Sequence, residues 1–311
     1  MTEVAILLAV YNGEKYLLEL IDSLMKQTYQ GFVCYIHDDG SRDNTLRIVR
    51  NIKERYPDKI VILEHKPTGS AKANFMSMLN YVKEPYIMFA DQDDYWVEDK
   101  IEVSLNTIKR LEGVGKKPSL VFTDLEVVDS NLSTTDKSFM KKMGFDPRRI
   151  KYQQLMTENI GAGCTMVMNR TLLNTVKRLK NIKNIRMHDG WFMVVAAIYG
   201  RIEYIPRQMV LYRQHESNVY GTRKQTVTGK IVSNIKLFCN GKNSIAKKEW
   251  LAQIDNMALE LLRFGDLPEN VRITLNELLA VHDKGKLHRI KFYINNHFMR
   301  NRRNLWLLIW V

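Results

Sequence analysis

The chain has 311 residues, of which 45% are hydrophobic and 26% are charged, and it contains no internal repeat or low-complexity linker. A chain of this kind can bury a full core, with room for one large domain and an appendage. The formal net charge is +13 and it is uneven, because residues 221–311 hold 16 Lys and Arg against 7 Asp and Glu. This asymmetry predicts a nearly balanced body and a basic segment that meets an anionic surface.

Three widely spaced cysteines argue against a disulfide framework or a zinc site and fit a reducing cytoplasm: Cys34, Cys164 and Cys239. The first residues lack the basic region that opens a signal peptide. No apolar stretch reaches about 18 residues, so we expect no segment that spans a bilayer.

Four short apolar runs within about the first ninety residues predict buried strands, at 4–10, 32–37, 60–63 and 86–90. Each of the first three runs is followed by hydrophobic residues at helical spacing. This alternation predicts an α/β fold, a Rossmann-like and mainly parallel sheet with helices on both faces.

The middle of the chain continues the same pattern less regularly. It predicts a helix at 100–111 and strands at 120–123, 165–168 and 202–211. Residues 129–151 are polar, basic and poorly periodic, which predicts a mobile excursion.

The strand at 86–90 stops at three carboxylates, Asp91, Asp93 and Asp94. Crowded carboxylates repel one another, so the cluster costs stability unless a cation is bound. Mg²⁺ and Mn²⁺ favour hard oxygen ligands, and ligands of an open α/β sheet bind at the carboxyl ends of its strands. The Asp-x-Asp therefore indicates a metal–diphosphate site. The alternative is a solvated turn or a helix cap, which the apolar strand before it and the aromatic pair after it disfavour.

A second acidic turn, Asp38-Asp39-Gly40-Ser41, follows the strand at 32–37. It should emerge at the same edge of the sheet as Asp91. A carboxylate there can accept hydrogen bonds from a base or a ribose, although by itself the segment is typical of an ordinary turn. No GxGxxG follows the first strand, which disfavours a dinucleotide site.

Three later features complete the candidate site. The loop Gly161-Ala162-Gly163 either lets the backbone approach a ligand or makes a tight turn. Asp189 lies near the start of an apolar helix at 192–198, where the helix dipole favours an ionised carboxylate, or where the residue caps the helix. Arg213 and His215 are two residues apart, so in an extended segment they share one face and suit a diphosphate–metal complex, although a lone His is usually structural.

These motifs together resemble the family 2 glycosyltransferases, inverting nucleotide-sugar enzymes with the GT-A fold. The resemblance covers roughly residues 4–221. It rests on four segments, Ala9-Val10-Tyr11-Asn12, Asp38-Asp39-Gly40-Ser41, Asp91-Gln92-Asp93-Asp94 and His188-Asp189. Within the family, the last two segments and Tyr212-Arg213-Gln214-His215 look most like bacterial rhamnosyltransferases of cell-surface polysaccharide synthesis, which use dTDP-L-rhamnose.

The resemblance implies a role for each matching residue. The nucleotide pocket would be lined by Val10, Tyr11, Asn12, Asp38, Asp39, Lys72, Asp91 and Gln92. The ligands of Mn²⁺ or Mg²⁺ would be Asp91, Asp93 and His215, with Asp93 as the main direct ligand, and Arg213 would contact the diphosphate. The general base would be Asp189, and the acceptor cleft would be lined by Gly161, Ala162, Gly163 and Trp191.

The resemblance also implies the reaction, a single displacement that converts dTDP-β-L-rhamnose into an α-linked rhamnoside on a lipid-linked saccharide acceptor. Tyr212-Arg213-Gln214-His215 stands where processive members carry QxxRW, so we expect addition of one or a few sugars. Three alternatives stay open: a UDP-sugar donor (glucose, GlcNAc or galactose), a nucleotidyltransferase, and a basic nucleic-acid-binding protein. Because no nucleic-acid motif appears and the charge lies outside the body, we expect no nucleic-acid partner.

The expected domains are a catalytic domain at 1–221 and a basic helical region at 222–311. Residues 287–311 combine Lys and Arg with Trp and Phe, which is typical of segments that lie in the headgroup plane of anionic membranes. This predicts a cytoplasmic enzyme held peripherally on the inner face of the cell membrane. A helical subdomain packed on the body, or a homo-oligomer interface, would explain the same pattern.

Overall fold

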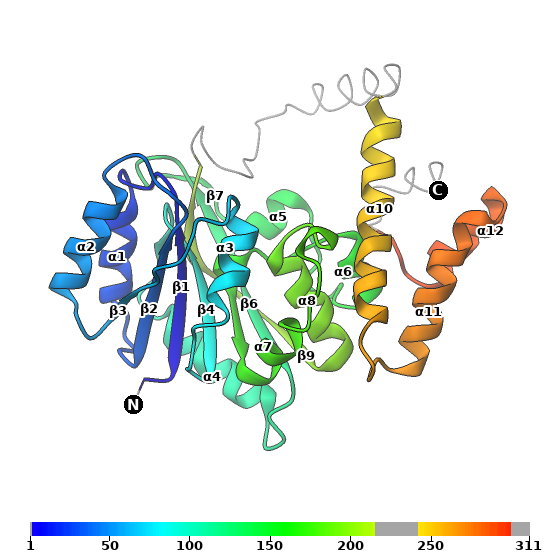
Figure 1. Cartoon of the computed structure of the whole chain (residues 1–311), viewed down its shortest axis with the longest axis horizontal. Coiled ribbons are helices and arrows are strands. Elements are labelled where there is room, and N and C mark those ends of the chain that lie inside the picture. The colour runs from blue at the N-terminus through cyan, green and yellow to red at the C-terminus, as the bar shows by residue number, and fades with distance from the viewer. Residues whose placement is uncertain (1, 215–241, 300–311) are drawn as a thin grey trace. The chain divides into compact units, whose positions relative to one another are not determined.

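The computed structural model describes residues 2–214 and 242–299 (Figure 1). The chain divides into two compact units, Met1–Leu179 with Met187–Arg213, and Lys180–Arg186 with Gln214–Val311. The expected boundary after residue 221 lies outside the described residues, so it remains a prediction.

In the described part of the first unit, nine strands form one sheet in the order β3-β2-β1-β4-β8-β6-β9-β5, with β7 paired to β6. The strands that run in one direction are β1 (Val4–Val10), β2 (Phe32–Asp38), β3 (Ile60–Ile62), β4 (Tyr86–Asp91), β6 (Ser119–Val128) and β9 (Arg201–Arg213). Those that run the opposite way are β5 (Tyr95–Trp96), β7 (Thr134–Asp136) and β8 (Met166–Asn169). The predicted α/β fold with a mainly parallel sheet is confirmed.

Helices cover both faces of this sheet (Figure 1). They are α1 (Leu17–Met25), α2 (Thr45–Arg55), α3 (Ala71–Met78), α4 (Lys100–Glu112), α5 (Phe139–Met143), α6 (Tyr152–Thr157), α7 (Arg170–Val176) and α8 (His188–Tyr199). On one face, Met88 of β4 joins a buried cluster that includes residues of α1, α2 and α4. The next residue, Phe89, points to the other face, where its ring contacts Phe75 of α3 and Phe192 of α8.

The strand register brings the two acidic turns to one edge. Val10 of β1 is paired with Asp38 of β2, and Ala9 is paired with Asp91 of β4. Because β1 lies between β2 and β4 and all three are parallel, Asp38 and Asp91 emerge on either side of the same strand end. This confirms the prediction made from the sequence.

Two parts of the pattern were predicted incorrectly. Residues 129–151 contain β7 and α5, and β7 pairs with an extended β6, so this stretch has regular elements that its poor periodicity did not predict; its predicted mobility remains a prediction. The two-residue strand β5 was not predicted, because its backbone partners, Val210 and Leu211 of β9, are far away in the sequence.

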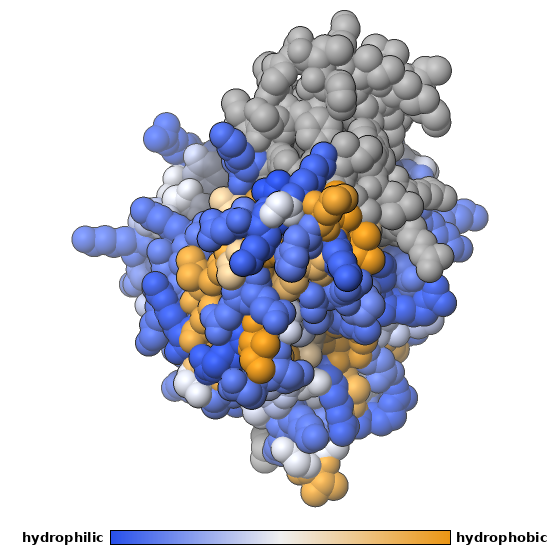
Figure 2. All heavy atoms as spheres, turned by 90° about the vertical axis from the view of Figure 1, so that its right-hand side faces the viewer, coloured by the Kyte–Doolittle hydropathy of each residue, from blue (hydrophilic) through white to orange (hydrophobic). Residues whose placement is uncertain are grey.

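The second unit is helical in its described part and comprises α10 (Lys242–Leu262), α11 (Glu269–Ala280) and α12 (Lys286–Asn295). Its interior holds Leu261, Leu275 and Tyr293, and the fully buried Glu260 accepts a hydrogen bond from Asn184. None of the helices in 2–214 and 242–299 has the length and apolar character needed to cross a membrane. On the face displayed in Figure 2, hydrophobic patches are separated by hydrophilic side chains.

Candidate active site

The candidate site begins at the turn between β4 and β5, which carries the acidic segment. The backbone N–H of Asp94 donates to the carbonyl of Asp91 at 3.2 Å, which closes the turn. The side chain of Asp94 is fully buried, whereas Asp91 and Asp93 are partly exposed. Asp94 is therefore the most buried of the three acidic residues of the turn.

Another carboxylate, Asp189, comes close to this turn from a distant part of the chain. Desolvation raises the pKa of Asp91 to about 7, and the negative charges of Asp93 and Asp189 add to the increase. The loop before β8 lies beside both groups, because a Cβ on Gly163 would lie 3.8 Å from Cβ of Asp189, and the sulfur of the next residue, Cys164, lies within 4.8 Å of oxygens of Asp91 and Asp94. Asp189 lies in the first turn of α8, and its Oδ1 accepts a hydrogen bond from the backbone of Gly190 at 2.6 Å.

Behind the acidic turn lies a buried cluster that sequence reasoning missed. Oxygens of Asp91 and Asp94 and the sulfur of Cys164 all lie within 4.8 Å of one another. The ammonium of Lys100 is also fully buried, 3.7 Å from the centre of the Trp96 ring, and burial lowers its pKa to about 7. Lys100 begins a helix after a turn, where a basic residue is usually exposed, so nothing local signalled its burial.

This arrangement fits a hard divalent cation. Oδ2 of Asp94 is buried and has no hydrogen-bond partner among the described residues, and oxygen donors of neighbouring carboxylates suit Mn²⁺ or Mg²⁺. Burial, with the charges of Asp94 and Asp91, raises the pKa of Cys164 well above its usual value, so its sulfur stays a thiol and a poor ligand. The carboxylate of Asp93 is not part of this close group, and its role as main ligand remains a prediction.

The end of β1 is tied to the acidic turn by a reciprocal pair of hydrogen bonds. The backbone N–H of Tyr11 donates to Oε1 of Gln92, and Nε2 of Gln92 donates to the carbonyl of Tyr11, each at 2.9 Å. Asn12 has a left-handed backbone with φ of 48°, and its N–H donates to the hydroxyl of Ser41 at 2.8 Å. Three sequence motifs are thereby joined at one edge, and the ring of Tyr11 remains 51% exposed there.

In the second acidic turn, the carboxylates of Asp38 and Asp39 accept hydrogen bonds from nearby loop residues. Oδ1 of Asp38 accepts the backbone N–H groups of Gly40 and Ser41, each at 2.8 Å, which is ordinary turn chemistry. Oδ1 of Asp39 accepts the hydroxyl of Thr68 at 2.9 Å and so holds the loop that precedes α3. Lys72, near the start of α3, has its pKa lowered by partial burial. Their nucleotide contacts remain predictions.

The predicted glycine loop lies against Asp189. A Cβ built on Gly163 would lie 2.9 Å from Nε2 of His188 and 3.8 Å from Cβ of Asp189. His188 is buried between aromatic rings, and burial lowers its pKa, which keeps the imidazole neutral at neutral pH. Gly161 is buried, whereas Ala162 and Gly163 are partly exposed, and the predicted acceptor contacts of this loop remain predictions.

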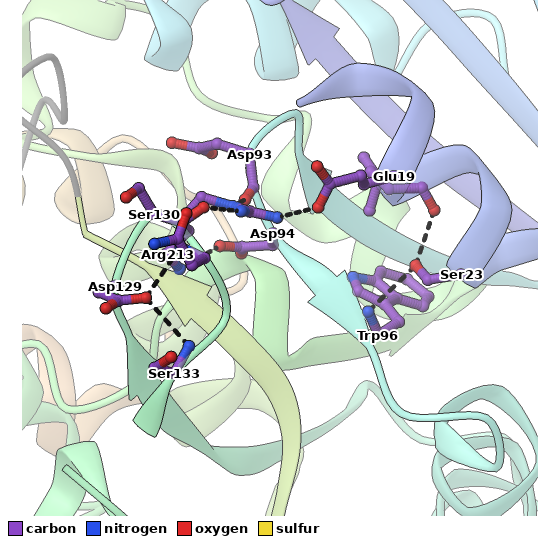
Figure 3. Close-up of polar contacts among 11 residues, drawn as sticks. Glu19, Ser23, Asp93, Asp94, Trp96, Asp129, Ser130, Ser133 and Arg213 are labelled. Carbon is purple, nitrogen blue, oxygen red and sulfur yellow. Dashed lines mark hydrogen bonds and ion pairs between the residues drawn. The ribbon is translucent and has the colours of Figure 1, made fainter. Parts of the chain in front are cut away.

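Two expected site residues are buried where a ligand contact was predicted, and a third lies outside the described residues. Trp191 is fully buried and its indole N–H donates to the carbonyl of Val176 at 3.0 Å, so it belongs to the core and does not line a cleft. The side chain of Arg213 is 1% exposed, and its guanidinium donates to protein acceptors (Figure 3). His215 lies outside the described residues.

The chain belongs to glycosyl transferase family 2, whose pattern matches residues 5–176. It is 32% identical over 224 residues to the dTDP-rhamnosyl transferase RfbG of Shigella flexneri, a match that covers 69% of this chain and 73% of that protein. It is 30% identical over 172 residues to the UDP-Glc:alpha-D-GlcNAc-diphosphoundecaprenol beta-1,3-glucosyltransferase WfgD of Escherichia coli, over 55% of this chain and 62% of that protein.

Solved structures show the same fold. TarS 1-349 of S. aureus in complex with UDP-GlcNAc is similar with a TM-score of 0.59 at 18% identity, over 93% of this chain and 79% of that chain. The match covers only 43% of a longer TarS chain. The mannosyltransferase PcManGT from Pyrobaculum calidifontis, in complex with GDP-Man and Mn²⁺, is similar with a TM-score of 0.53 at 14% identity, over 94% of this chain and 73% of that chain. The expected GT-A fold is therefore confirmed.

Proposed function

We propose that this protein transfers a sugar with inversion from a nucleotide sugar to an acceptor hydroxyl, with dTDP-β-L-rhamnose as donor and a lipid-linked saccharide as acceptor. The observation that carries the proposal is the loop of Gly163 and Cys164, which lies beside Asp189 and beside the oxygens of Asp91 and Asp94. The likeness to a protein named as a dTDP-rhamnosyl transferase supports this choice of donor.

In this proposal each site residue has a separate role in the transfer reaction. Asp189 takes the proton from the acceptor hydroxyl as its oxygen attacks the anomeric carbon opposite the diphosphate, which yields an α-linked rhamnoside. Mn²⁺ or Mg²⁺ held by Asp91 and Asp93 would neutralise the diphosphate leaving group. Gly163 lets the loop backbone lie close to His188 and Asp189, because a side chain there would meet His188.

A UDP-sugar is the second candidate donor. One relative is named as a UDP-glucose-dependent enzyme, and one similar structure contains UDP-GlcNAc. The same carboxylates would serve either donor, because the diphosphate is common to both.

The test is a donor-hydrolysis and transfer screen of the whole protein across dTDP- and UDP-sugars, with Mn²⁺ or Mg²⁺ and with EDTA. We expect dTDP-rhamnose to be consumed fastest, and EDTA to abolish turnover. Faster consumption of a UDP-sugar would overturn the rhamnose assignment, and no consumption of any donor would overturn the transferase proposal.

The acceptor proposal includes contact with an anionic membrane surface, at the inner face of the cell membrane. From 284 to 311 the sequence has seven Lys and Arg and no Asp or Glu. Within α12, Leu287 is 85% exposed and Ile294 is 45% exposed, beside the exposed Lys286 and Lys291. Exposed apolar and basic side chains on one helix suit the headgroup region of anionic lipids. A homo-oligomer interface is the alternative use of this helix.

A further inference from the structure

We propose that Arg213 is a positioning residue, whose buried guanidinium holds the acidic turn of β4–β5 in the geometry that binds the cation and the diphosphate. It does not contact the diphosphate itself. This inference rests on the proposed function and assigns a different role from the one that the sequence indicated.

The guanidinium of Arg213 joins three segments through separate nitrogens (Figure 3). Nε donates to the carbonyl of Asp93 at 2.9 Å, Nη2 donates to Oε2 of Glu19 at 2.6 Å, and Nη1 donates to the carbonyl of Ser130. The backbone N–H of Arg213 also donates to Oδ1 of Asp94 at 3.3 Å. The residue therefore contacts the acidic turn at both Asp93 and Asp94.

The acceptors of Arg213 are themselves held in place. Ser130 lies in the turn between β6 and β7, where Oδ1 of Asp129 accepts the backbone N–H of Ser133 at 3.0 Å. Glu19 lies on α1, and α1 also holds the far end of the acidic turn, because the hydroxyl of Ser23 accepts the backbone N–H of Trp96 at 3.1 Å (Figure 3). Arg213 and Ser23 thus fix the two ends of the turn to the same helix.

Burial makes this arrangement difficult to exchange for a ligand contact. The guanidinium lies 4.2 Å from the centre of the Tyr16 ring, and the side chain is 1% exposed. Moving it toward a diphosphate would leave the carbonyls of Asp93 and Ser130 without this donor, and unmade buried hydrogen bonds are costly. The planar fork of Arg matches three acceptors at once, whereas the single ammonium of Lys cannot.

The test measures three variants, Arg213→Lys, Glu19→Gln and the double variant that carries both changes. The control is Asp22→Asn, a matched change at an exposed residue of α1. We expect both single variants to raise the KM for the donor and the Mn²⁺ concentration for half-maximal rate by about tenfold, with kcat changed much less. The double variant should resemble Arg213→Lys, because both changes act on the same contact between Arg213 and Glu19. Asp22→Asn should match the wild type.

A direct diphosphate contact predicts a different result. Glu19→Gln would then release the guanidinium and leave the donor KM unchanged or lower, while Arg213→Lys would raise it; this outcome overturns the proposal. Amide hydrogen exchange of residues 91–94 provides a readout that does not require activity. Faster exchange in Arg213→Lys and Glu19→Gln supports the positioning role even if no donor is turned over, and unchanged exchange in both overturns it.

Discussion

At the residue scale, three carboxylates of the same chemical type meet three environments. Asp91 is desolvated between two other negative charges, so its pKa is raised to about 7. Asp93 has its backbone held by Arg213, and Asp189 accepts the N–H of Gly190 at the start of α8. In the proposed function these distinct environments would let identical side chains bind a cation and take a proton.

The first prediction concerns Asp189, the proposed base. Asp189→Asn keeps the shape of the side chain but cannot accept the proton of the acceptor hydroxyl, so kcat should fall by about 10²–10⁴. Donor binding, measured by calorimetry with dTDP and Mn²⁺, should stay close to that of the wild type. Wild-type turnover by the variant would contradict the assignment of the base.

The second prediction concerns the pH dependence of stability without metal. The pKa of Asp91 is raised from 3.8 to about 7 by folding, so its contribution to the free energy of unfolding is present below about pH 3.8 and is lost as the pH rises through 7. In EDTA, Asp91→Asn should therefore raise the free energy of unfolding at pH 8 and flatten its decline between pH 4 and 8. Urea denaturation at several pH values measures this. An unchanged pH profile would contradict it, and the exposed Asp22→Asn is the control.

At the element scale, the register of β1 with β2 and β4 brings the acidic turns of the candidate site together. Strand pairing brings Asp38 and Asp91 to one edge, and the loop hydrogen bonds of Gln92 and Ser41 join that edge into one surface. The elements after β5 supply the opposing side, because α8 carries Asp189 and β9 ends in Arg213.

The third prediction tests the junction that connects α8 to β9. A Cβ on Gly200 would lie 1.7 Å from the backbone carbonyl oxygen of Pro118, so the added methyl forces backbone movement. Gly200→Ala should lower the free energy of unfolding by about 3 kcal/mol, the upper end of the usual cost of overpacking. In Gly115→Ala, where no atom lies within 4 Å of the added Cβ, urea denaturation should show little change. Equal stability of the two variants would contradict the argument.

Strands and helices were predictable from the sequence where the pattern of apolar residues within the element itself indicates them. The buried run of β1 matches its predicted bounds of 4–10, because a central strand is apolar along its whole length. The strand β5 was missed, because two residues carry no periodicity and its partner is β9.

Side-chain partners were less predictable than side-chain chemistry. Arg213 was visible as a cation near the site, but Glu19, which binds it, lies 194 residues away in the chain. The resemblance implied that Trp191 lines the acceptor cleft, whereas the structure buries it within the apolar helix α8. A sequence reveals which charges exist, whereas their partners depend on tertiary contacts.

At the scale of the whole molecule, the two units differ in net charge. The basic residues that exceed the acidic ones lie mainly in 221–311, and the acidic cation site lies in the first unit. In the proposed function the acceptor is lipid-linked, and the basic region would draw the protein to an anionic surface without adding positive charge to the catalytic unit.

The fourth prediction tests this surface. The full chain should sediment with anionic vesicles at low salt and be released at high salt, because exposed charges are screened. Leu287→Gln, which changes the 85% exposed residue of α12, should weaken vesicle binding several-fold, whereas Ile273→Gln, at a 50% exposed site of α11, should not. Failure of the wild type to sediment with these vesicles would count against membrane contact.

The central claim is that carboxylates from two strand ends and from α8 act together on one nucleotide sugar. The most direct measurement is the anomalous diffraction of crystals grown with Mn²⁺ and dTDP. We predict one strong anomalous peak that bridges the diphosphate and the carboxylates of Asp91 and Asp93, with Asp189 facing the open side of the diphosphate. A peak bound elsewhere, or a nucleotide bound away from the β1–β4 edge, would contradict the account.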